Sequence, residues 1–174
     1  AEKAALMAPH VDVILCETMS SLDLCRGALA GGQAAGKPVW LSVSVDDRDG
    51  TRLRSGEPVA ALAEVIAQHP TAAVLANCSM PEAMEAALAV LRGMGRPFGA
   101  YANGFSEISS LPLPETHDAP DYCARHDLTP ERYTAFALRW VDMGATIVGG
   151  CCEVGPAHIR HLAAALKSAG HQIA

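Results

Sequence analysis

The stretch Ala145-Thr146-Ile147-Val148-Gly149-Gly150-Cys151-Cys152 contains the pattern on which the interpretation of the fold depends. Residues 145–148 predict a short buried strand, because they are apolar or β-branched. The two glycines end that strand, and Gly155-Pro156 further along the chain is typical of a helix start. Both thiols are therefore expected where a strand gives way to a loop.

A third cysteine, Cys78, occupies the same kind of place. The run Ala72–Asn77 before it predicts a buried strand, and Ser79 and Glu82 after it have the spacing of a capping box at a helix start. Three thiols at two equivalent strand ends make a candidate site for a soft metal, because thiolates are the ligands that such metals prefer.

The alternation of an apolar strand with an amphipathic helix occurs five times along the chain. The expected strands are Val11–Cys16, Val39–Val45, Ala72–Asn77, Pro97–Ala102 and Ala145–Val148. Each is a nearly continuous apolar run, which is typical of a parallel sheet covered by helices. One long loop, from about Phe105 to Leu128, interrupts the pattern, and loops of this length are often functional.

Polar or reactive residues lie at or near the C-terminal ends of all five expected strands. They are Glu17, Ser42 with Ser44, Cys78, Asn103, and Cys151 with Cys152. In a TIM barrel every strand delivers its C-terminal residue to one central mouth, whereas a doubly wound sheet gathers them at one switch point. The even distribution favours the barrel, so we expect an α/β fold of the (β/α)8 TIM-barrel type.

Composition limits the kinds of partner. The 174 residues are 50% hydrophobic and 18% charged, so residues 1–174 are expected to form a single domain with its own core. The net charge of −6 and the lack of any Lys/Arg cluster argue against a nucleic-acid partner. No apolar run is long enough to span a membrane and no export signal is visible, so we expect a cytoplasmic protein with its six cysteines reduced.

Taken in order, several motifs along the whole chain resemble the zinc-dependent homocysteine S-methyltransferase family. They are the segment from Asp12 to Glu17-Thr18, Lys37–Ser42, Ser55-Gly56, Asn77-Cys78-Ser79, Tyr101-Ala102-Asn103 and Gly149–Cys152. The family fold is a (β/α)8 barrel, and the resemblance implies that this chain holds strands four to eight and lacks the first three. The family usually continues the cysteine pair with Gly-Thr, where this sequence has Glu153-Val154.

The resemblance also implies a reaction. Cys78, Cys151 and Cys152 would hold Zn²⁺ and leave one position open for the thiolate of homocysteine. That thiolate would attack the methyl group of a small onium donor, with S-methylmethionine or S-adenosylmethionine favoured, and give methionine. Glu17 is expected to hold the ammonium group of homocysteine. Asn77 and Asn103 are expected to position the substrate or its neighbours.

Other interpretations of the same residues are open. The chain is alternatively a truncated zinc-binding remnant without activity, or Cys151-Cys152 is a redox pair. The site cysteines could be buried packing residues, Glu17 a helix-start carboxylate, and the two asparagines turn residues. The remaining cysteines, Cys16, Cys25 and Cys123, are interpreted as packing residues. His158 and His161 are expected on the last helix, outside the site.

Overall fold

A computed structural model of the protein describes residues 1–106 and 124–173, which form a five-stranded parallel sheet. The strands are β1 (Ile14–Met19), β2 (Val39–Val43), β3 (Ala73–Asn77), β4 (Phe98–Tyr101) and β5 (Ile147–Val148). They pair in the consecutive order β1-β2-β3-β4-β5. A doubly wound sheet reverses its order at a switch point, and this sheet does not. Because crossovers are right-handed, consecutive order places the connecting helices on one side, as in a barrel.

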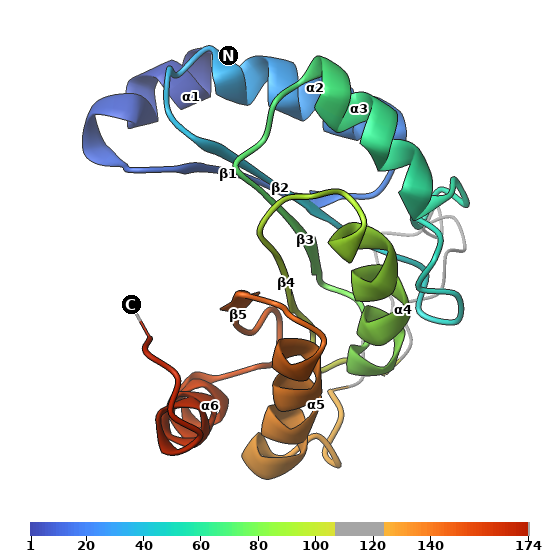
Figure 1. Ribbon diagram of the computed structural model, residues 1–174, viewed down its shortest axis with the longest axis vertical. Coiled ribbons are helices and arrows are strands. Elements are labelled where there is room, and N and C mark those ends of the chain that lie inside the picture. The colour runs from blue at the N-terminus through green and yellow to red at the C-terminus, as the bar shows by residue number, and fades with distance from the viewer. Residues whose placement is uncertain (107–123, 174) are drawn as a thin grey trace, which may run out of the picture.

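The helices lie along the convex side of the curved sheet (Figure 1). They are α1 (Glu2–Met7), α2 (Leu22–Gln33), α3 (Leu62–Gln68), α4 (Pro81–Arg92), α5 (Pro130–Asp142) and α6 (Pro156–Ser168), with 3₁₀ turns at Ala8–His10 and Val59–Ala61. Ser21 and Thr129 cap α2 and α5, each accepting a hydrogen bond from the backbone N–H three residues on. None of the helices in these described ranges has both the length and the apolar character needed to cross a membrane.

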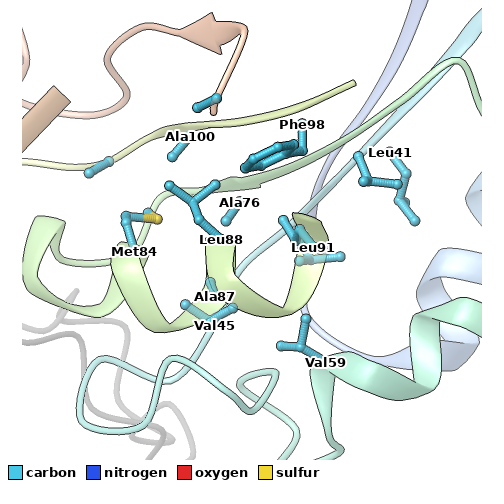
Figure 2. Packing of buried hydrophobic residues seen from close by; sticks show 14 of the residues in the cluster. Leu41, Val45, Val59, Ala76, Met84, Ala87, Leu88, Leu91, Phe98 and Ala100 are labelled. Carbon is cyan, nitrogen blue, oxygen red and sulfur yellow. The ribbon is translucent and has the colours of Figure 1, made fainter. Parts of the chain in front are cut away.

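The core fills the layer between the outer face of the sheet and the helices. On α4, Met84, Ala87, Leu88 and Leu91 form an apolar stripe that is completely buried. Figure 2 shows Met84 and Leu88 directed towards the small side chains of β3 and β4. On α5, Tyr133, Phe136, Ala137 and Trp140 are buried, whereas Val141 is partly buried. On α2, Leu24 is 51% exposed because it lies on the solvent side of the helix.

The concave face of the sheet carries the alternate strand residues. Within β1, Ile14 and Cys16 are buried against the helices, whereas Leu15 between them is 40% exposed. Leu15 pairs in register with Trp40, which is half-buried on the same face. Apolar side chains on the concave face are therefore only partly covered by the rest of the described residues.

Two predicted local features were wrong. The first strand begins at Ile14 rather than Val11 and runs on through Glu17, because its pairing starts where Ile14 N–H donates to Pro38 O at the beginning of β2. Ser79 does not form a capping box. Met80 is the N-cap of α4, and the buried Ser79 hydroxyl instead accepts from Val45 N and donates to Val45 O, both at 2.9 Å.

Candidate metal centre

Three cysteine thiols meet at the C-terminal edge of the sheet. Cys78 follows β3 directly, and Cys151 with Cys152 lies in the loop after β5. The Cys78 and Cys152 Sγ atoms are 3.9 Å apart, those of Cys151 and Cys152 are 3.8 Å apart, and all three lie within 4.8 Å of one another. The structure thus brings together residues that are more than seventy positions apart in the chain.

The spacing of the sulfur atoms fits a tetrahedral metal. Zn–S bonds of about 2.3 Å in tetrahedral geometry place two sulfur ligands roughly 3.8 Å apart. The Cys78–Cys152 and Cys151–Cys152 Sγ separations, 3.9 and 3.8 Å, agree with this value. Cys78 and Cys151 are half-buried and Cys152 is exposed, so the cluster is open on one side. The donor set therefore suits a soft cation with a free coordination position.

The thiols do not ionise alike. The neighbouring Cys78 thiol stabilises the Cys151 thiolate and lowers the pKa of Cys151 to about 6. The same contact, together with burial, raises the pKa of Cys78, and burial also raises that of Cys152. Three anionic sulfurs this close repel one another, so only a bound cation would make all of them thiolates near neutral pH.

The backbone around the cysteines is closely held. Cys78 has the left-handed φ of 52°, and its N–H donates to Tyr101 O at 3.2 Å. Cys151 N–H donates to Ala102 O at 2.9 Å, and Gly104 N–H donates to Cys152 O at 2.8 Å. A non-glycine residue in the left-handed region persists only where its surroundings hold it there. These backbone hydrogen bonds therefore fix the position of the thiols.

Glu17 lies on the concave face near the thiols' edge of the sheet. Its carboxylate is exposed and accepts a hydrogen bond from the Tyr101 hydroxyl at 3.3 Å. Two strands separate β1 from β4, so this contact exists because the sheet curves. Burial is the main cause of the raised pKa of Tyr101, which remains a hydrogen-bond donor at neutral pH. Tyr101 belongs to a quoted motif, yet sequence reasoning did not identify it as a site residue.

Asn77 is completely buried and links three strands. Its Oδ1 accepts from Thr18 N (3.1 Å) and from Ser42 Oγ (2.8 Å), and its Nδ2 donates to Thr18 Oγ1 (2.9 Å). Thr18 has a φ of 63°, so the amide holds a left-handed residue next to Glu17. Hydrogen bonding from Asn77 also contributes to the lowered pKa of Cys151. Asn77 thus connects the first strand to the metal centre.

Asn103 is also completely buried, at the end of β4. Its Oδ1 accepts from Phe105 N at 3.3 Å, and its Nδ2 has no partner within residues 1–106 and 124–173. A buried amide donor without an acceptor is costly. Asn103 therefore has an unused polar atom that a bound molecule could satisfy.

The remaining cysteines and histidines lie away from the centre. Cys16 and Cys25 are buried under the helices, and burial raises the pKa of Cys25 to about 12. Cys123 and most of the long loop fall outside the described residues. His158 Nδ1 accepts from Gly155 N at the start of α6, and His161 contacts the Thr134 hydroxyl.

The comparisons point to one family. The family model described as homocysteine S-methyltransferase matches residues 1–166. The chain is similar to homocysteine S-methyltransferase YbgG of Bacillus subtilis (28% identity, covering 94% of this chain and 50% of that protein) and to homocysteine S-methyltransferase of Escherichia coli (29%; 94% and 49%). It thus spans about half the length of these curated relatives.

A solved structure supports the same likeness. The chain superimposes on the metallated form of the Escherichia coli homocysteine methyltransferase MmuM with a TM-score of 0.68 and 26% identity, covering 92% of this chain and 47% of that one. The predicted α/β fold of TIM-barrel type is confirmed by this match and by the consecutive strand order.

Proposed function

The chain belongs to the homocysteine S-methyltransferase family, and from this membership we propose that it carries the zinc site of a methyltransferase that converts homocysteine to methionine. The observation that carries the proposal is the cluster of three Sγ atoms within 4.8 Å at the C-terminal edge of the sheet. We assign Cys78, Cys151 and Cys152 as the zinc ligands. When bound there, zinc would supply a position at which a fourth thiol binds as its thiolate.

Homocysteine would place its ammonium group at Glu17. This carboxylate is exposed on the concave face, and the Tyr101 hydroxyl holds one of its oxygens while leaving the group accessible. Asn77 acts through Thr18, since its amide is engaged with that residue and with Ser42. Asn103 has the buried Nδ2 that a substrate oxygen could satisfy.

The donor is proposed to be a small onium compound, with S-methylmethionine or S-adenosylmethionine favoured. A lone pair of the homocysteine thiolate forms the new S–C bond while the bond from the methyl carbon to the onium sulfur breaks. The donor leaves as a neutral thioether, so no base is needed. An anionic site formed by thiolates and Glu17 favours a cationic donor over a neutral one. We also place the protein in the cytoplasm as a prediction.

A second candidate is a zinc-binding chain without catalytic activity. The observation that favours it is the partly accessible concave face, on which Leu15 is 40% exposed. The two candidates differ in homocysteine binding, which only the first requires. Calorimetric titration of the zinc-loaded protein with homocysteine separates them.

The metal proposal is tested by measuring zinc in the purified protein and in Cys78→Ala. We expect about one zinc per chain in the wild type, loss of zinc in Cys78→Ala, and retention in Cys25→Ala, which removes a buried thiol from α2 instead. Retention of zinc by Cys78→Ala would contradict the ligand assignment. Stoichiometric zinc without methionine formation from sulfonium, betaine or methylfolate donors would contradict the methyltransferase half of the proposal.

A further inference from the structure

The turn that carries Cys78 is held by the segment that follows β2. Hydrogen bonds join this segment to residues 77–80. Ser44 Oγ donates to Asn77 O (3.0 Å) and Arg54 Nη2 donates to Cys78 O. Ser79 Oγ accepts from Val45 N and donates to Val45 O (both 2.9 Å), and Met80 N donates to Asp47 Oδ1 (2.7 Å). Each residue of the turn thus has its own partner in residues 44–54. The turn is fixed from outside the metal centre.

Arg54 makes the contact to the metal-site residue itself. Its side chain is half-buried, and its Nε is buried with no hydrogen-bond partner among the residues that the structure describes. Its own backbone N–H donates to Ser44 O at 3.2 Å, which fixes it beside the turn. Within the same residues Arg54 forms no ion pair, although a half-buried guanidinium ordinarily has a carboxylate partner. The hydrogen bond to Cys78 O is therefore the polar contact that holds the Arg54 guanidinium in place.

The Cys78 carbonyl needs such a donor because of the conformation of its residue. With a φ of 52°, Cys78 has left the extended geometry of β3, and this left-handed geometry is strained in a non-glycine residue. The same conformation brings its Sγ to 3.9 Å from that of Cys152. If Cys78 relaxed to an extended conformation, its side chain would swing away from the other two thiols.

We propose that Arg54 is a positioning residue for the metal centre: its guanidinium holds the Cys78 carbonyl and so fixes the backbone conformation that directs the Cys78 thiol at Cys151 and Cys152. This inference rests on the proposed zinc site. A direct contact between Arg54 and the carboxylate of homocysteine is the rival role. The contact with Cys78 O disfavours that role, because it engages Nη2 of the guanidinium with the backbone of the turn.

The experiment measures zinc affinity by competition with a chromophoric chelator, and metal geometry from the thiolate-to-metal absorption of the Co²⁺-substituted protein. The variants are Arg54→Met, which removes the donor, and Arg54→Lys, which restores one. Arg52→Met is the matched control, since Arg52 lies in the same segment, is mostly exposed, and contacts Gly56 O and Asp49 instead.

We expect Arg54→Met to weaken zinc binding by about 10- to 100-fold and to change the Co²⁺ spectrum, with much of the affinity restored in Arg54→Lys and none lost in Arg52→Met. Equal affinity in Arg54→Met and the wild type would overturn the inference, as would an equal loss in Arg52→Met. A raised KM for homocysteine with unchanged zinc affinity would assign Arg54 to the substrate instead.

The remaining outcomes are also decisive. If Arg54→Met fails to fold, Arg54→Gln, which keeps a shorter neutral donor, is expected to fold with intermediate affinity. Failure of both variants to fold would assign Arg54 to the stability of the fold and overturn the inference. Absence of zinc from the wild type would instead refute the proposed metal site, and that result is distinguishable from the others.

Discussion

The hydroxyl of Tyr133 joins the loop of the vicinal cysteines to the end of β4, and its removal in Tyr133→Phe tests that connection. The hydroxyl accepts from Ala102 N at 3.0 Å and donates to Gly149 O at 2.6 Å. Tyr133 and Ala102 are completely buried, and burial raises the pKa of Tyr133, so the hydroxyl stays protonated. Phenylalanine keeps the ring and its edge-to-face contact with Trp140 but supplies neither hydrogen bond.

The expected loss of stability is about 2 kcal/mol. Ala102 N–H would be left buried with no acceptor, at about 1–3 kcal/mol, whereas Gly149 O is half-buried and partly recovers its partner from water. In a chain of this size, each kcal/mol shifts the Tm by about 2–4 °C. Urea unfolding of the metal-free protein measures the loss directly, and chelator competition should show weaker zinc binding in the same variant.

Tyr101→Phe is the matched control. It removes a tyrosine hydroxyl at the same edge of the sheet, but the partner there is the exposed carboxylate of Glu17 at 3.3 Å. Water can replace that contact, so the loss of stability should stay below about 1 kcal/mol. If Tyr133→Phe were no less stable than Tyr101→Phe, the Tyr133 hydroxyl would not carry the connection described above.

Two further predictions concern the packing of the sheet and the stability of the protein at acidic pH. In Gly99→Ala a Cβ would lie 1.7 Å from Ile147 O, so we expect loss of the β4–β5 pairing and a large loss of stability in urea unfolding. The control is Gly27→Ala in α2, where a Cβ would have nothing within 4 Å. This variant should gain about 0.5–1 kcal/mol in its free energy of unfolding. The ion pair with Arg125 lowers the pKa of Asp127, so its stabilising effect is present above the unfolded pKa near 4 and is lost as pH falls through the lower folded value. Asp127→Asn should therefore be less stable than the wild type at pH 7, with a difference that shrinks as the pH falls below about 4, and a constant difference in urea midpoint over this pH range would refute this.

The sequence predicted the features that depend on local pattern. Apolar runs located all five strands, and their alternation with amphipathic segments predicted a parallel sheet covered by helices. The thiols could be placed together because parallel strands end at one edge of a sheet. These predictions rest on the spacing of apolar residues and on the direction of the strands. Both can be inferred from the sequence without knowledge of tertiary contacts.

The sequence could not predict the features that depend on distant partners. The start of β1 is set by pairing with β2, so its apolar residues alone gave a boundary that was too early. Ser79 has the spacing of a capping residue, but burial beside Val45 gives its hydroxyl a different partner. Arg54 lies in a polar loop with nothing in its surroundings to mark it, and only the fold brings it to the Cys78 carbonyl.

The strained residues of this protein show how the fold and the site are connected. Among the described residues, the non-glycine residues with positive φ are Thr18, Cys78 and Glu153, and all three lie at the C-terminal edge of the sheet. Thr18 is held by the amide of Asn77, and Cys78 by the guanidinium of Arg54. Strain of this kind persists only when other contacts outweigh it. The polar side chains behind the thiols therefore act as supports that keep the cysteine cluster in a conformation that the backbone alone would not adopt.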